Sequence, residues 1–129
     1  MKNTGPTAKT LALVKARNDG ACLRCNVRAG EQCHHRRPRK MGGSRRPEIN
    51  SPENLVWICG HCHAAIESNR EAAIATGWLV PEGLDGPLET PLVDLLGREF
   101  FLTEEGDVKF INPLVGFYPV NPADHVRPW

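Results

Sequence analysis

The stretch NLVWICGHCH (residues 54–63) joins a run of β-forming residues to a Cys-x2-Cys pair and a following histidine. Its first half favours a short strand, because branched and aromatic side chains suit a pleated surface. A second Cys-x2-Cys pair lies nearer the N-terminus, and two such pairs can surround one zinc ion with four thiolates at about 2.3 Å each. The four cysteines of this predicted structural zinc site are Cys22, Cys25, Cys59 and Cys62.

The two cysteine pairs are separated by 33 residues. Pairs in a zinc ribbon are usually separated by roughly 15–20 residues. The longer gap indicates that a folded segment is inserted between them, and four cysteines paired only by chance are the alternative. Cys33 lies within the insert, and we expect it to be a small buried residue of a strand rather than a redox or metal-binding residue.

The ends and hydropathy of the sequence predict a protein of the reducing cytoplasm. The N-terminal MKNTGPTAKT lacks the apolar core of a signal peptide. No stretch approaches the roughly 20 apolar residues of a membrane span, so we expect no membrane contact. Cysteines in a reducing compartment indicate metal binding rather than disulfide bonds.

The net charge of +1 conceals an asymmetry along the chain. Residues 1–50 contain twelve Lys and Arg against three Asp and Glu, whereas residues 81–129 contain three against nine. A basic half beside an acidic half indicates contact with nucleic acid through the basic half.

Periodicity and turn residues predict an α+β chain in three parts. These are an N-terminal helical segment (1–19), a core (20–77) and a β-rich or irregular extension (78–129). The expected helices cover 7–18 and 62–76; the expected strands cover 31–36, 54–58, 92–95, 98–102 and 108–111. A punctuated loop over 37–53, an extended connector over 79–91, a hairpin turn at 105–107 and an irregular tail over 112–129 complete the prediction.

The insert begins with CHHRRP (residues 33–38), and a histidine follows the second cysteine pair. A His-His pair, an Asn-Leu pair and a Cys-x2-Cys-His run, in this order, resemble the HNH endonuclease family. The resemblance covers about residues 20–67 and implies a ββα-metal core framed by the zinc site. Small stand-alone HNH proteins of bacteriophages, linked to genome packaging, are similar in organisation, which would make a phage terminase a protein partner.

The resemblance also implies a role for each matching residue. His34 would bind a catalytic metal, and His35 would be the general base that deprotonates the attacking water. Asn54 would bond backbone across the hairpin and orient the base. His63 would bind the metal from the helix. Glu67 stands where many members carry a further histidine, and its carboxylate would complete the metal site; a solvated helix residue is the alternative for Glu67.

Elementary chemistry agrees with this division of roles. Neighbouring side chains of a strand point to opposite faces, so His34 and His35 cannot easily bind one ion together. An imidazole titrates near neutrality and can accept a proton from water. One divalent cation would relieve charge at the phosphate; Mg²⁺ or Mn²⁺ is favoured, and Ni²⁺ or Zn²⁺ also suits imidazole.

A basic loop follows the histidine pair. We expect its cations to neutralise phosphates of duplex DNA with loose sequence preference, since no base-reading motif is evident. A solvated loop without a ligand is the alternative. The predicted DNA-binding residues are Arg36, Arg37, Arg39, Lys40, Arg45 and Arg46.

The sequence therefore predicts a metal-dependent DNA endonuclease. Two other functions remain open: a zinc module that binds DNA without cutting it, and an assembly factor of a packaging motor. A DNA-binding module needs no base beside the metal, so His35 discriminates it from the enzyme. The excess of acidic residues in the extension argues against DNA binding by this part of the chain. We expect the extension to bind a partner protein or to fold back on the basic loop.

Overall fold

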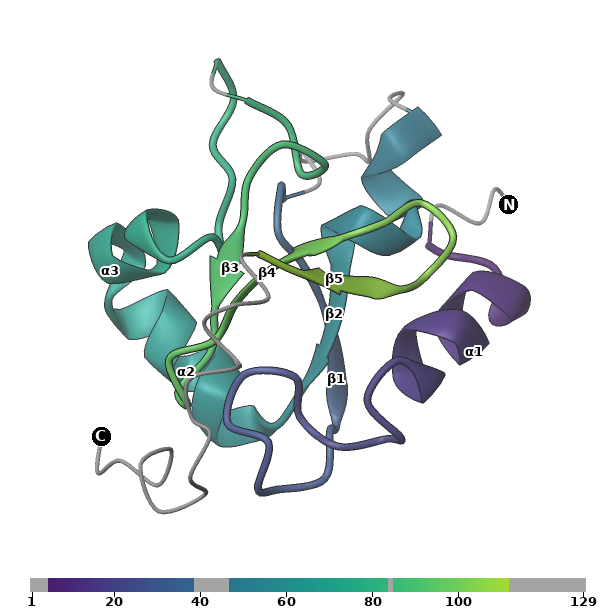
Figure 1. Cartoon of the computed structure of the whole chain (residues 1–129), viewed down its shortest axis with the longest axis horizontal. Coiled ribbons are helices and arrows are strands. Elements are labelled where there is room, and N and C mark those ends of the chain that lie inside the picture. Colours follow the sequence, from purple (N-terminus) through teal and green to yellow (C-terminus); the bar gives the residue numbers. More distant parts are fainter. Residues whose placement is uncertain (1–4, 39–46, 84, 112–129) are drawn as a thin grey trace.

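The computed structural model describes residues 5–38, 47–83 and 85–111 (Figure 1). They form a mixed α+β structure with two small antiparallel sheets, as predicted. In chain order the elements are α1 (Ala8–Ala16), β1 (Gln32–His35), the 3₁₀ turns η1 (Pro47–Asn50) and η2 (Pro52–Asn54), β2 (Leu55–Ile58), α2 (Gly60–Ser68), α3 (Arg70–Ala75), β3 (Leu92–Val93), β4 (Glu99–Leu102) and β5 (Val108–Phe110). None of the described helices has the length and apolar character needed to cross a membrane.

The first helix forms where the sequence predicts it. The Thr7 side chain caps α1 by accepting from the backbone N–H of Thr10 at 3.1 Å. Val14 is buried and anchors the helix, whereas Leu13 is 40% exposed. The helix ends before Asp19 and Gly20, which both have positive φ.

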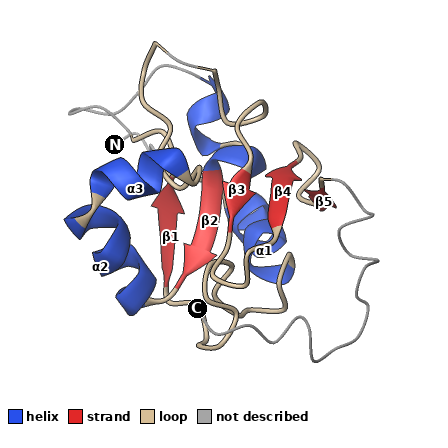
Figure 2. Cartoon of the chain, turned by 60° about the vertical axis from the view of Figure 1, so that its left-hand side comes forward, coloured by secondary structure: helices blue, strands red, loops and turns tan. Residues whose placement is uncertain are grey.

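Strands β1 and β2 pair as an antiparallel hairpin that holds the histidine pair in a fixed register. His34 lies opposite Val56, and His35 lies opposite Leu55. Figures 1 and 2 show α1 on one side of this hairpin and the α2–α3 pair on the other. The hairpin is therefore the central layer of the core.

The prediction of one continuous helix over 62–76 is wrong. The helical segment starts earlier, at Gly60, and is broken at Asn69, whose backbone (φ −138°, ψ 73°) is not helical. The Asn69 side chain accepts from the N–H of Ala72 and caps α3. Asparagine competes for backbone bonds in this way, so it favours a helix start over a helix interior.

The extension forms a three-stranded sheet in the order β3-β4-β5. The predicted hairpin turn at 105–107 joins β4 to β5, as the pairing of Leu102 with Val108 shows. Gly77 connects α3 to this extension with φ +85°, and a Cβ there would lie 2.0 Å from the Pro91 carbonyl oxygen. Only glycine fits this close approach. The expected tail over 112–129 lies outside the described residues.

One hydrophobic core runs through both sheets. Val56 and Ile58 of β2 belong to the same buried cluster as Trp78, Phe100 and Leu92. The ring centroids of Trp78 and Phe100 are 6.5 Å apart in an edge-to-face arrangement. The extension is thus packed on the core segment.

Arg36 ties the extension to the hairpin through its buried guanidinium. The side chain is 0% exposed, and its nitrogens donate to four backbone carbonyl oxygens at 2.6–3.0 Å. Burial lowers the pKa of Arg36 to about 9, so the group keeps its charge at neutral pH. The four accepting carbonyls belong to Gly77, Glu53, Pro87 and Thr90.

We expect Arg36→Met to lower the free energy of unfolding by about 3 kcal/mol or more, because buried carbonyls lose their charged donors. Urea unfolding followed by circular dichroism measures the loss. Arg28→Met removes an exposed arginine and should change the free energy by no more than about 0.5 kcal/mol. Equal effects of the two substitutions would contradict the structural role of Arg36.

Candidate metal centres

The four cysteines predicted to bind zinc converge in the structure. Their sulfur atoms all lie within 4.8 Å of one another. The sulfurs of Cys25 and Cys59, one from each pair, are 4.0 Å apart. Thiolates placed tetrahedrally at about 2.3 Å from zinc are roughly 3.8 Å apart, so the cluster fits that ion. The four residues can therefore hold a structural metal such as zinc.

Each cysteine pair is shaped by backbone bonds to sulfur. The N–H of Cys25 points to the sulfur of Cys22, and the N–H of Cys62 points to that of Cys59, both at 3.4 Å. Asn26 closes the first turn with φ +63°. The second pair occupies the start of α2, where the helix dipole favours negative sulfur.

Within the cluster, electrostatics favour the thiolate, the form that binds metal, at Cys22, whereas burial raises the pKa of Cys59. The hydrogen bond from the Cys62 thiol lowers the pKa of Cys22 to about 4 and raises that of Cys62. Arg24 adds a positive donor, with its Nη1 atom 3.2 Å from the Cys62 sulfur. The sequence reasoning did not single out Arg24, although its place inside the first Cys-x2-Cys pair was a signal.

Cys33 lies outside the cluster, on β1. Cys33 is only partly buried, whereas the sequence predicted a buried residue. Desolvation by burial raises its pKa, so the neutral thiol is favoured. Its environment fits a small structural side chain.

A second group of potential ligands joins β1 to α2. Ligand atoms of His34, His63 and Glu67 all lie within 4.8 Å of one another. The two imidazole rings meet edge to face with centroids 5.5 Å apart. His63 and Glu67 share one face of α2, with Nε2 and Oε2 3.9 Å apart, as their four-residue spacing predicts.

His34 is the buried member of this group. Its Nε2 atom donates to the Trp78 carbonyl oxygen at 2.9 Å, because a carbonyl can only accept. This bond leaves the lone pair on Nδ1 and fixes the ring, as second-shell bonds do for metal-binding histidines. Burial also lowers the pKa of His34. The neutral imidazole that a metal requires therefore persists to lower pH than in an ordinary histidine.

Glu67 is the exposed member, and it has two partners. One carboxylate oxygen faces His63, and the other accepts from Arg70 at 3.3 Å. Arg70 was not predicted from the sequence, and its place one turn after Glu67 is the signal that could have found it. The donor set of two imidazoles and one carboxylate suits a divalent transition metal.

His35 lies apart from these three residues, as expected for neighbours on a strand. Its Nε2 atom is 2.8 Å from Oδ1 of Asn50 at the end of η1. An amide oxygen accepts, so Nε2 carries the proton and the lone pair is on Nδ1. Asn50 was missed by the sequence reasoning, because its loop contains no spacing that indicates which residue reaches β1.

Asn54 forms the backbone contact expected of it. The side chain is fully buried, accepts from the N–H of Arg37 at 2.7 Å and donates to the carbonyls of Arg37 and Ile49. It therefore clamps the exit of β1, two residues after His35, to the loop that precedes β2. A buried amide with these three bonds rigidifies the strand that carries both histidines.

The prediction that Arg36 and Arg37 contact DNA is wrong. Arg36 is 0% exposed and Arg37 is 7% exposed. Arg37 donates to the carbonyl oxygens of Val80, Pro81 and Asp85. A run of arginines in sequence does not reveal which of them fold inward to satisfy buried carbonyls. The other predicted DNA-binding residues, Arg39, Lys40, Arg45 and Arg46, lie outside the described residues.

Comparisons of the chain with protein-family models, with curated proteins and with solved structures found no match. The function is therefore inferred from the cysteine cluster and from the group of His34, His63 and Glu67.

We expect Cys59→Ser to release zinc and to unfold the protein, since a structural zinc site contributes about 10–16 kcal/mol of apparent binding free energy. Cys33→Ser, outside the cluster, should retain both zinc and stability. Elemental analysis and thermal melting measure these outcomes. A Cys59→Ser protein with full zinc and an unaltered melting transition would contradict the assignment.

We also expect His34→Ala and His63→Ala to weaken binding of a second divalent ion by at least about tenfold while zinc is retained. Titration calorimetry of the zinc-loaded protein with Ni²⁺ or Mn²⁺ tests this. His61→Ala is the matched control, because His61 is an exposed histidine of the same helix. Equal affinity in all three variants would exclude the group as a metal site.

Proposed function

We propose that this protein is a metal-dependent DNA endonuclease of the HNH type. One observation carries the proposal. His34 and His63, 29 positions apart in the sequence, meet with Glu67 at a common point, while His35 is held separately by Asn50. A metal-ligand group beside an independently oriented imidazole is what hydrolysis of a phosphodiester requires.

The residues of β1 and α2 would divide the work of hydrolysis. A divalent ion held by His34, His63 and Glu67 would supply Lewis-acid charge at the phosphate and the leaving oxygen. His35 would accept the proton of the attacking water at Nδ1, because Asn50 fixes the tautomer with the proton on Nε2. Asn54 would hold the strand in register, so that His35 keeps its position as it gains charge.

The proposed DNA contacts are reduced to the cations of the loop between β1 and η1. With Arg36 and Arg37 assigned to structure, four basic residues remain for phosphates: Arg39, Lys40, Arg45 and Arg46. They follow the histidine pair directly, so the polyanion would be bound beside the proposed base. Contacts of this kind carry affinity without reading sequence.

We expect the protein to nick supercoiled plasmid when Mg²⁺, Mn²⁺ or Ni²⁺ is added. His35→Ala should lower the rate by about 10²–10⁴-fold, which is the usual contribution of a general base. Asn50→Ala should give a smaller loss, because it only removes the orientation of that base. Gel assays with matched zinc content measure the rates, and His61→Ala should cut like the wild type.

Metal-dependent nicking that survives His35→Ala would refute the base assignment. The absence of nicking with every metal, together with retained DNA binding, would instead favour a zinc module that binds DNA without cutting it.

A further inference from the structure

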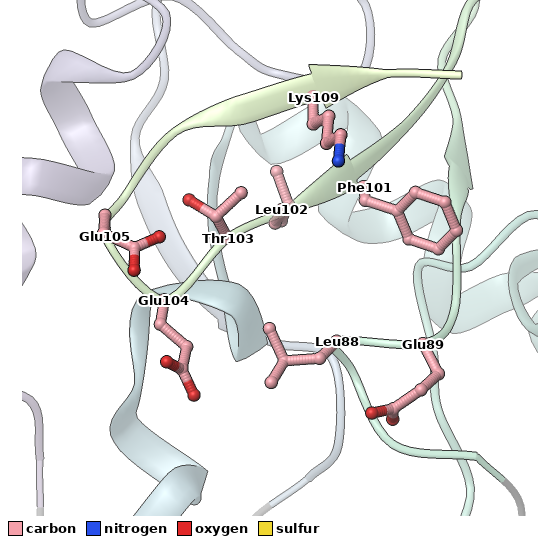
Figure 3. A pocket seen from close by; sticks show the side chains of 8 residues that line it. All are labelled: Leu88, Glu89, Phe101, Leu102, Thr103, Glu104, Glu105 and Lys109. Atoms are coloured by element: carbon pink, nitrogen blue, oxygen red, sulfur yellow. The ribbon is translucent and has the colours of Figure 1, made fainter. Parts of the chain in front are cut away.

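A groove lies between the connector that precedes β3 and the hairpin of β4 and β5. It is open to solvent and has a volume of about 630 Å³. Figure 3 shows Leu88 and Glu89 of the connector on one side, with Phe101 of β4 and Lys109 of β5 across the groove. The metal-ligand residues of the proposed enzyme do not line it, so the groove is separate from that site.

The groove continues into a second cavity of about 370 Å³. Leu88, Glu89 and Glu104 line both spaces. The second cavity adds Glu53, which is 3% exposed and whose Oε1 atom has no hydrogen-bond partner among the described residues. The combined groove therefore extends from the β4–β5 turn to the η1–η2 loop.

Carboxylates dominate this combined groove. Five glutamates line it, against the two cations Arg37 and Lys109. The guanidinium of Arg37 is already bonded to backbone carbonyls. The surplus of negative charge repels a phosphate backbone and attracts a cationic ligand. The glutamates are Glu48, Glu53, Glu89, Glu104 and Glu105.

Apolar side chains occupy the middle of the groove. Leu88 is 37% exposed, and Phe101 is partly exposed on β4. Figure 3 shows Leu88 between Glu104 and Glu89, with the Phe101 ring across the groove from Glu89. An apolar centre with a charged rim is the arrangement of a protein-binding surface, in which the centre supplies affinity and the rim selects the partner.

We propose that this groove binds a basic peptide segment of a partner protein, anchored by an apolar side chain between Leu88 and Phe101. Lysine or arginine residues flanking the anchor would face Glu89 and Glu104. This function does not depend on metal or DNA, so it stands or fails independently of the nuclease activity.

Fluorescence anisotropy with a short labelled peptide of alternating leucine and arginine tests the proposal on the full zinc-loaded chain. The wild type should bind this peptide at least about tenfold more tightly than a glycine–arginine peptide of equal charge. Phe101→Ser should remove that preference. Glu89→Gln with Glu104→Gln should weaken binding by about tenfold and reduce its salt dependence.

Glutamine at position 89 can still accept from the N–H of Gly86, so the double variant keeps this local bond. Asp19→Asn with Glu71→Gln is the matched control, since it removes two exposed carboxylates outside the groove. Equal binding by the wild type and the groove double variant, or no preference for the leucine-containing peptide, would overturn the proposal. A dimer in sedimentation that dissociates in Phe101→Ser would assign the groove to a second copy and would also overturn it.

Discussion

Four cysteine sulfurs must share one small volume, and this requirement positions most of the described chain. It fixes the first cysteine turn against the start of α2, where Cys62 is buried and His63 follows at once. The backbone reinforces the junction, because the N–H of Leu23 donates to the Trp57 carbonyl at 3.0 Å. The helix that bears His63 is thereby set beside the strand that bears His34. Four thiolates would complete the tetrahedral coordination sphere of a zinc ion, so the contribution of this cluster is geometric rather than chemical.

A second constraint links the extension to the same strand. His34 and Arg36 are two residues apart on one side of the β1 segment, and they donate to the adjacent carbonyls of Trp78 and Gly77. The bond that orients a proposed metal ligand and the bond that anchors the extension therefore act on one short segment. Loosening the extension would disturb the orientation of His34, so the two parts are mechanically coupled although they form separate sheets.

The described residues show where part of the charge asymmetry of the sequence lies in the folded chain. Glu89, Glu104 and Glu105 of the acidic extension line the groove of Leu88 and Phe101, and the potential metal ligands of β1 and α2 do not. Two arginines of the basic segment, Arg36 and Arg37, instead satisfy interior carbonyls. Net charge near neutrality thus conceals an acidic groove and a basic segment of the sequence.

Local features of the sequence predicted the α+β class, the helix at α1, the strands β1 and β2, the β4–β5 turn and the cysteine cluster. Each of these depends on local periodicity, turn residues or ligand spacing. Tertiary contacts decided the inward turn of Arg36 and the pairing of His35 with Asn50. Those features depend on which buried carbonyls and rings lie nearby in space, and residues distant in sequence supply these partners.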